Sequence, residues 1–180
     1  KETGDEYRGF LYGQFMATAD GVKVIEYNVR LGDPEAINVM ALLDLDTANF
    51  LKKIADGDLN ANEATFSPLA SICKYLVPSA YPTSSNEHVL VDLNEGDIEQ
   101  AGFSIIYASI INNDPGLVTI GSRAFALVGI GNDLFNLSEK METILKNIEP
   151  HTLRHRKDIG DKSIIQEKIK KMNDLRGISV

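Results

Sequence analysis

Strand-forming and polar residues alternate over most of the first thirty positions. Leu11 and Phe15 belong to a run that predicts a strand over residues 9–17, and a second run predicts a strand over residues 22–30. Between them, Thr-Ala-Asp-Gly occupies residues 18–21, and Asp-Gly is a strong signal for a tight turn between antiparallel strands. The pattern therefore predicts a β-hairpin in which the two strands lie side by side.

Apolar residues then take up helical spacing. Residues 35–43 and 47–55 each carry apolar side chains three and four positions apart, which predicts two short amphipathic helices. Asp46 is a typical N-cap for the second helix, and Gly57 is a typical residue just beyond its end.

Two longer helices are predicted in the C-terminal part. The first covers residues 137–149, where Asn136 with Glu139 three positions later has the form of a capping box. The second is an amphipathic segment over residues 162–175, with Ile165, Ile169 and Met172 at helical spacing.

Short strands are predicted between these helix pairs. They cover residues 66–77, 88–93, 103–111, 117–120 and 124–130. The polar residues 94–100 read as a turn or loop. Short strands at close spacing predict a small antiparallel sheet or partial barrel with flanking helices.

The chain is therefore expected to be an α+β protein of two parts. The polar segment 58–63 contains two Asn residues and reads as a linker, so we place the boundary between residues 1–60 and residues 61–180.

The second strand of the predicted hairpin carries charge on one face. The period of two sends Glu26, Asn28 and Arg30 to one side and residues such as Ile25 and Tyr27 to the other. Neighbours on that side lie roughly 6.5 to 7 Å apart, which suits a hard cation and phosphate oxygens above the strand. The alternative is the ordinary solvated face of an antiparallel strand.

A helix start follows at once. Gly32 is expected to end the strand, with Asp33 as the N-cap, Pro34 at the first helical position and Glu35 in the first turn.

Composition limits the functional classes. The 180 residues are 43% hydrophobic, enough for a substantial core, and the net charge of −8 argues against a general nucleic-acid surface. No long apolar run or signal peptide is present, so we expect a cytoplasmic protein that does not enter a membrane. Residue 1 is Lys, and a strand begins within ten residues, which suggests a cut chain or a partial sequence.

The residues most often found in metal and redox sites give little signal. Cys73 lies in an apolar run and is expected to be a buried, reduced thiol. His88, His151 and His155 do not have the spacing of metal ligands, and we expect surface or structural roles for them.

A family resemblance changes the interpretation of the charged strand. Residues 26–35, Glu-Tyr-Asn-Val-Arg-Leu-Gly-Asp-Pro-Glu, resemble the metal-binding signature of the phosphoribosylamine-glycine ligases of the ATP-grasp superfamily. The Glu-x-Asn core is shared by ATP-grasp enzymes, and Arg-x-Gly-Asp-Pro-Glu is the more specific part. The motifs Tyr81-Pro82, residues 119–123 and residues 156–160 are also similar to that family.

The resemblance implies a fold. Residues 9–57 are similar to the last part of an ATP-grasp domain, and residues 71–164 are similar to the small C-terminal domain of the same ligases. The expected fold is therefore the C-terminal half of an ATP-grasp domain followed by a small antiparallel β domain with flanking helices.

The resemblance also implies an activity. Such a ligase joins glycine to 5-phosphoribosylamine in purine biosynthesis and uses ATP as cosubstrate with Mg²⁺ or Mn²⁺. Glu26 and Asn28 would bind the metal, and the Arg30 guanidinium would contact the γ-phosphate or acyl-phosphate oxygens.

Substrate contacts are implied at four further positions. Backbone N–H groups after Gly32 would suit the glycine carboxylate, and Asp33 is either a contact for the amino group of the substrate or a simple N-cap. Glu35 and Arg123 complete the implied substrate-binding set. The basic residues 154–157 either face the phosphoribosyl end of the substrate or form a solvated loop.

Two departures from the superfamily pattern are visible. Many ATP-grasp enzymes have a metal carboxylate twelve positions before the Glu of Glu-x-Asn, where this chain has Gln14, which is either a carbonyl ligand or a polar strand residue. The N-terminal half of the ligase, with the lysines and glycine-rich loop that cover the triphosphate, is also missing. By itself this chain should hold half an active site and should need the missing N-terminal half as its partner.

Two other functions stay open. The chain could come from another ATP-grasp ligase or carboxylase, or it could be a non-catalytic fragment or subunit module.

Overall fold

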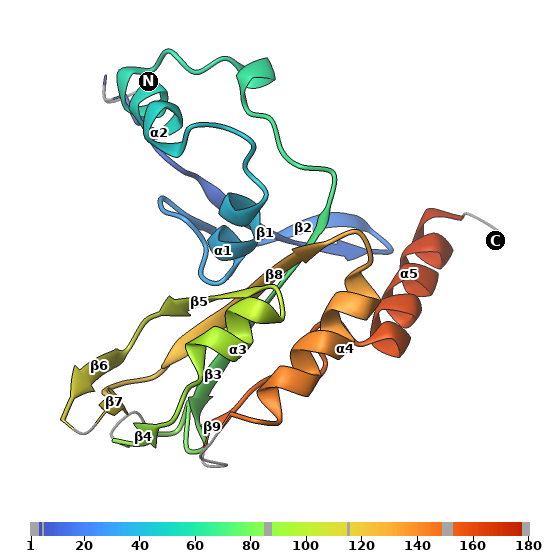
Figure 1. Ribbon diagram of the computed structural model, residues 1–180. Coiled ribbons are helices and arrows are strands. Elements are labelled where there is room, and N and C mark those ends of the chain that lie inside the picture. Colours follow the sequence, from blue (N-terminus) through green and yellow to red (C-terminus); the bar gives the residue numbers. More distant parts are fainter. Residues whose placement is uncertain (1–3, 5, 85–87, 115, 149–152, 178–180) are drawn as a thin grey trace. The chain divides into compact units, whose positions relative to one another are not determined.

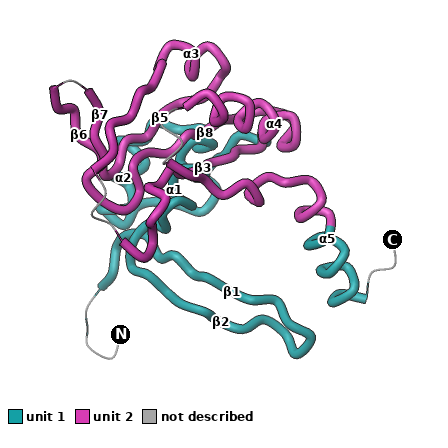
Figure 2. Tube along the Cα trace, turned by 90° about the horizontal axis from the view of Figure 1, so that it is seen from below, with its two compact units in different colours: residues 1–68, 167–180 teal, residues 69–166 magenta. Residues whose placement is uncertain are grey.

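The computed structural model describes residues 4, 6–84, 88–114, 116–148 and 153–177. The chain divides into two compact units, which Figure 2 shows in different colours. Unit 1 contains residues 1–68 and 167–180, and unit 2 contains residues 69–166. The division that we expected after residue 60 stays a prediction about domains.

A β-hairpin begins unit 1. Strands β1 (Tyr12–Thr18) and β2 (Gly21–Asn28) pair antiparallel around the predicted turn (Figure 1). Gly21 has φ of +100°, a conformation that glycine adopts without the strain a Cβ would add. The register shifts between Gln14 and Phe15, so the hairpin contains an irregularity that the alternation did not predict.

Two helices and a short 3₁₀ turn complete the regular structure of residues 29–68. They are α1 (Glu35–Ala41), α2 (Thr47–Asp56) and η1 (Ala61–Glu63). The caps predicted for α2 are confirmed, because Asp46 accepts a hydrogen bond from the Asn49 N–H and Gly57 ends the helix in the left-handed conformation.

The predicted start of α1 is wrong. Pro34 occupies the N-cap position and no side chain caps the helix, so Asp33 is not its N-cap. The cause lies in the backbone, because Pro34 has a non-helical ψ of 3° and the first helical residue is Glu35.

Unit 2 is built on two antiparallel sheets. The larger has the order β5-β8-β3-β9, and the smaller has the order β4-β7-β6. The strands are β3 (Ala70–Pro78), β4 (Leu90–Val91), β5 (Phe103–Tyr107), β6 (Ile110–Asn113), β7 (Gly116–Thr119), β8 (Phe125–Gly131) and β9 (Leu153–Arg154). The predicted antiparallel arrangement is confirmed.

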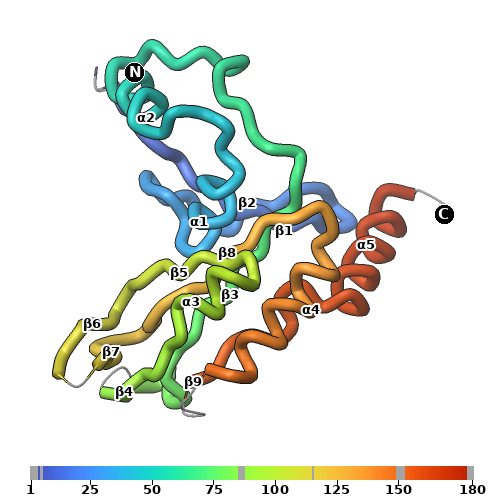
Figure 3. The backbone as a smooth tube through the Cα atoms, viewed as in Figure 1, coloured from blue at the N-terminus to red at the C-terminus, as the bar shows by residue number. Residues whose placement is uncertain are grey.

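Helices cover the larger sheet. Helix α4 (Leu134–Leu145) packs on β3 and β8, and α3 (Glu95–Gln100) packs on β5, as the trace in Figure 3 shows. Met141 of α4 and Phe125 and Leu127 of β8 are fully buried in this core. Cys73 is buried and free of disulfide bonds, as expected.

Three predictions in unit 2 are wrong in detail. Residues 95–100 form a helix and not a loop, because Asn94 caps it by accepting from the Asp97 N–H. The predicted strand 103–111 is two strands, interrupted where the Ala108 and Ser109 N–H groups bond to carbonyls of residues 124 and 123.

The start of α4 also differs from the prediction. Asp133, and not Asn136, is the N-cap, and its carboxylate accepts from the Phe135 and Asn136 N–H groups.

The last helix, α5 (Lys162–Arg176), confirms the predicted C-terminal helix and contributes residues to both units. Among the residues that the structure describes, no helix has the length and apolar character needed to cross a membrane.

Candidate functional site

The charged face of β2 brings two of the predicted metal ligands together. The Asn28 Nδ2 donates a hydrogen bond of 2.9 Å to Glu26 Oε1, so the two side chains project from the same side of the strand. Glu26 is exposed and Asn28 is half-buried. Their polar ends are therefore accessible and adjacent.

The neighbouring strand adds two residues to this face. Gln14 lies directly opposite Glu26 in the register of the hairpin, and Tyr12 lies opposite Asn28. Residues directly opposite each other in an antiparallel pair have side chains on the same face, so the Gln14 amide lies on the same side as Glu26.

A fit to a divalent cation can be judged from these donor atoms. Mg²⁺ and Mn²⁺ prefer oxygen ligands, and Glu26 supplies a carboxylate while Asn28 and Gln14 supply amide oxygens. A half-turn of the Asn28 amide would present Oδ1 where Nδ2 now lies, beside Glu26. No cluster of three or more His, Cys, Asp or Glu residues occurs in the described part of the chain. A cation held here would need further oxygen ligands, which phosphates and water supply in most Mg²⁺ sites.

Arg30 lies outside the strand. β2 ends at Asn28, two residues earlier than expected, so the strand geometry does not extend the row to Arg30. The exposed guanidinium donates from Nη1 to the Leu31 carbonyl over 2.9 Å. Arg30 follows the Glu26–Asn28 pair closely in the chain and its charged end is in solvent.

The turn between β2 and α1 is tightly packed. Gly32 is buried, and its carbonyl accepts a hydrogen bond of 2.9 Å from the Ala36 N–H. The Pro34 carbonyl accepts from the Ile37 N–H over 2.9 Å. These two amide groups at the start of α1 therefore donate within the chain, and the anion contact that we expected from N–H groups after Gly32 stays a prediction.

Tyr12 and Glu35 connect the hairpin to this turn. The Tyr12 hydroxyl donates to Glu35 Oε1 over 3.2 Å. Desolvation, the hydrogen bond to Glu35 and the nearby charges of Glu35 and Glu26 raise the pKa of Tyr12, so the hydroxyl keeps its proton. We did not single out Tyr12 as a site residue, although it shares the period of two with Gln14.

Arg123 belongs to unit 2, whereas the other predicted site residues belong to unit 1. Its guanidinium carbon lies 5.4 Å from the centre of the Tyr75 ring, in a cation–π arrangement.

The basic segment 154–157 is partly engaged with neighbouring groups. The Arg154 guanidinium donates to the carbonyls of Ser79 and Tyr81. Arg156 forms an ion pair with Asp158, and both oxygens of that carboxylate take part. Hence the guanidinium groups of these two arginines already bind carbonyl and carboxylate groups of unit 2.

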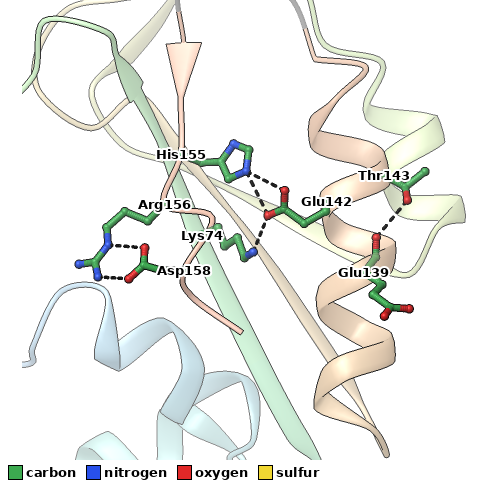
Figure 4. A network of polar contacts seen from close by, with 7 residues as sticks. All are labelled: Lys74, Glu139, Glu142, Thr143, His155, Arg156 and Asp158. Atoms are coloured by element: carbon green, nitrogen blue, oxygen red, sulfur yellow. Dashed lines mark hydrogen bonds and ion pairs between the residues drawn. The ribbon is translucent and has the colours of Figure 1, made fainter. Parts of the chain in front are cut away.

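A second polar cluster in unit 2 was not predicted. Glu142 of α4 accepts from the ammonium of Lys74 over 2.5 Å and from His155 Nε2, which lies 3.1 Å from both carboxylate oxygens (Figure 4). Lys74 is fully buried on β3, and its counter-charge comes from α4. Burial opposes ionisation of Glu142, but the hydrogen bonds from Lys74 and His155 outweigh it and lower the pKa of Glu142.

This cluster gives His155 the structural role that we expected of it. His88 Nδ1 also has a backbone partner, the Thr119 carbonyl at 3.0 Å. His151 lies outside the described residues.

Comparison with protein families identifies both parts of the chain. The phosphoribosylglycinamide synthetase C domain matches residues 71–162, and the ATP-grasp (A) domain of the same synthetase matches residues 1–36. The second match includes Glu26, Asn28 and the turn up to Glu35.

Curated relatives carry the same description. The phosphoribosylamine–glycine ligase of Methanothermobacter thermautotrophicus is 44% identical over 98% of this chain and 39% of its own length. The corresponding ligase of Pyrococcus furiosus is 38% identical over 97% of this chain and 38% of its own length. The chain therefore spans about two fifths of the length of these relatives.

Solved structures show a matching fold. The phosphoribosylamine–glycine ligase of Thermotoga maritima superimposes with a TM-score of 0.63 and 25% identity, over 88% of this chain and 38% of that one. The biotin carboxylase domain of the Hydrogenobacter thermophilus 2-oxoglutarate carboxylase, a complex with MgADP, gives a TM-score of 0.53 at 16% identity over 86% of this chain and 35% of that one. The second likeness concerns the fold alone.

Proposed function

Because the chain belongs to the phosphoribosylglycinamide synthetase family, we propose that it supplies the metal- and phosphate-binding part of a phosphoribosylamine–glycine ligase. The observation that carries this proposal is the pairing of Glu26 and Asn28 on one face of the hairpin, inside the segment that matches the ATP-grasp domain of that family.

The proposed reaction has two steps. A glycine carboxylate oxygen attacks the γ-phosphorus of ATP, and ADP leaves. The amine of phosphoribosylamine then attacks the carbonyl carbon of the glycyl phosphate, phosphate leaves, the nitrogen releases a proton, and glycinamide ribonucleotide forms. Both steps bring anionic groups together, so the enzyme must offset negative charge.

Glu26 and Asn28 would hold Mg²⁺ or Mn²⁺ in this enzyme, with Gln14 as a candidate third donor. A cation at that position would neutralise charge on the phosphate oxygens of the nucleotide. The oxygen-rich face of the hairpin suits it, as the donor atoms above indicate.

Arg30 would contact the transferring phosphoryl group. Its guanidinium is exposed and has one N–H engaged with the Leu31 carbonyl, which leaves other donors for phosphate oxygens. Asp33 is exposed and remains a candidate contact for the glycine amino group. Arg123 would act on the phosphoribosyl end of the substrate.

The rest of the ligase would cover the hairpin. Large apolar side chains remain exposed along both strands and the turns that flank them, which is unusual for a surface that faces only water. They are Leu11, Phe15, Met16, Val22, Val24, Ile25, Tyr27, Val29 and Leu31. This exposure supports a chain that works together with the part of the ligase that lies outside the segment matched here. The alternative, a non-catalytic module, predicts the same exposed surface without turnover.

A hybrid enzyme tests the proposal. This chain would replace the matched 39% of the Methanothermobacter thermautotrophicus ligase, and the hybrid would be expressed in a bacterial strain that lacks its own ligase and cannot grow without purines. We expect growth without purines and, in the purified hybrid, ADP release that depends on glycine and phosphoribosylamine. A folded hybrid that releases no ADP would contradict the proposal.

A further inference from the structure

The contact between Tyr12 and Glu35 joins two elements that the chain separates by more than twenty residues. Tyr12 lies at the start of β1 and Glu35 is the first residue of α1. Their hydrogen bond of 3.2 Å spans the turn that contains Arg30 and Asp33. This hydrogen bond thus connects the hairpin to the end of the turn that follows it.

Gly32 shows how closely this contact is packed. A Cβ atom at Gly32 would lie 2.7 Å from Glu35 Oε2 and 2.9 Å from two carbons of the Tyr12 ring, closer than such atoms approach one another. The φ of Gly32 is not positive, so the position needs glycine for space and not for backbone conformation. The Tyr12 ring, the Glu35 carboxylate and the Gly32 backbone therefore pack closely against one another.

The register adds a link to the metal ligands. Tyr12 lies directly opposite Asn28, so its backbone is fixed beside one predicted ligand while its hydroxyl reaches Glu35. Glu35 Oε1 therefore accepts the hydrogen bond from Tyr12, and Glu35 Oε2 lies against Gly32. That geometry favours a structural task for Glu35 over a direct contact with substrate.

We propose that Tyr12 is a positioning residue of the ligase, which holds Glu35 and thereby fixes the turn 29–34 at the metal-binding face of the hairpin. Glu35 then acts as the partner of Tyr12 and not as a substrate ligand. The expected effect of Tyr12 on catalysis rests on the proposed function. The coupling between the Tyr12–Glu35 hydrogen bond and the order of the turn 29–34 does not, because it concerns the folded chain alone.

Hydrogen exchange tests the coupling in the 180-residue chain. The Ala36 N–H bonds to the Gly32 carbonyl, so its exchange rate reports how firmly the turn is held. We expect Tyr12→Phe to speed exchange at Ala36 severalfold, and Glu35→Met, which has no oxygen to accept the hydrogen bond, to do the same. Tyr107→Phe is the matched control, because Tyr107 also donates to a carboxylate, that of Glu95, in unit 2. Unchanged exchange in Tyr12→Phe, or an equal change in the control, would overturn the coupling.

Kinetics of the hybrid ligase test the effect on catalysis. We expect Tyr12→Phe to lower kcat/KM for glycine about tenfold, since small misplacements of reacting groups cost that much or more, and to leave KM for ATP within about twofold. The double variant Tyr12→Phe with Glu35→Met should lose no more than either single variant, because each substitution removes the same hydrogen bond. If the unmodified hybrid turns over and Tyr12→Phe equals it, or if the two losses multiply, the positioning role is wrong while the ligase function stands.

Discussion

The side-chain amide of Asn28 donates to Glu26 Oε1 over 2.9 Å, two positions apart on the same strand. A β-strand allows this contact only for side chains on one face. The two predicted metal ligands therefore lie side by side. Gln14, which is the cross-strand partner of Glu26, is the natural position at which to add a third ligand.

Gln14→Glu should create a metal-dependent hairpin. Two carboxylates directly opposite each other repel, so we expect the melting temperature of the chain to fall in the presence of a chelator. Millimolar Mn²⁺ should restore it, because a cation between Gln14→Glu and Glu26 removes the repulsion. Thermal unfolding followed by circular dichroism, with and without Mn²⁺, measures both effects.

The control for this variant is Met16→Glu, which adds the same charge on β1 opposite Lys23. Its melting temperature should not depend on Mn²⁺. A Gln14→Glu chain that melts at the same temperature with chelator and with Mn²⁺ would argue that Gln14 is only a polar strand residue.

Arg30→Lys should reduce turnover while it keeps the charge. The guanidinium offers several donors in a planar fork, and an ammonium cannot reproduce a two-point contact to a phosphoryl group. In the hybrid ligase we expect kcat to fall about 10- to 100-fold, with a smaller change in KM for ATP. Lys23→Arg, which conserves charge on the same hairpin, should leave kcat unchanged. Equal kcat for Arg30→Lys and the unmodified hybrid would remove Arg30 from the phosphoryl-transfer step.

Glu142→Gln should lower the free energy of unfolding of unit 2 and should make that free energy depend less on pH. The folded-state pKa of Glu142 lies below its ordinary value of 4.5, so its contribution to stability is present above that pH and is lost as the pH falls through the folded value. Removing this carboxylate breaks the ion pair of buried Lys74 with Glu142, which costs about 3 kcal/mol at neutral pH. Urea unfolding of the full chain at pH 7 and pH 3.5 should show a smaller difference for the variant than for the native chain.

Glu139→Gln is the matched control for Glu142→Gln. Glu139 lies one turn earlier on the same helix and is exposed, and Figure 4 shows that its backbone carbonyl, not its carboxylate, accepts from Thr143. We expect its unfolding curve to match that of the native chain. If Glu139→Gln and Glu142→Gln lose the same stability at pH 7, the Lys74–Glu142 ion pair does not carry the effect.

The hairpin was predictable because its signals are local. Asp20-Gly21 specifies the turn, and the period of two places Glu26 and Asn28 on one face without any knowledge of the rest of the fold. The caps of α2 were predictable for the same reason, since Asp46 and Gly57 act on their own helix.

What escaped prediction depends on contacts that are distant in sequence or weak in pattern. The hydrogen bond between Tyr12 and Glu35 joins a strand to a helix, and the residues next to either one in the sequence do not predict it. Helix α3 has Ile98 as its only buried residue, so it has no apolar stripe, and its cap at Asn94 reads equally well as part of a turn. The pairing of Lys74 with Glu142 required the packing of α4 on β3.

We propose that Glu26 helps to hold the cation on which ligation depends, and the variant Glu26→Gln in the hybrid ligase measures this contribution. Glycine-dependent ADP release would be compared with that of Asp20→Asn, which makes the same carboxylate-to-amide change at the tip of the hairpin. A metal contact contributes several kcal/mol to the transition state, so we predict that Glu26→Gln loses about 100-fold or more in turnover, while Asp20→Asn retains it. If folded Glu26→Gln turns over within about twofold of the unmodified hybrid, well inside the tenfold that 1.4 kcal/mol represents, Glu26 does not hold the cation.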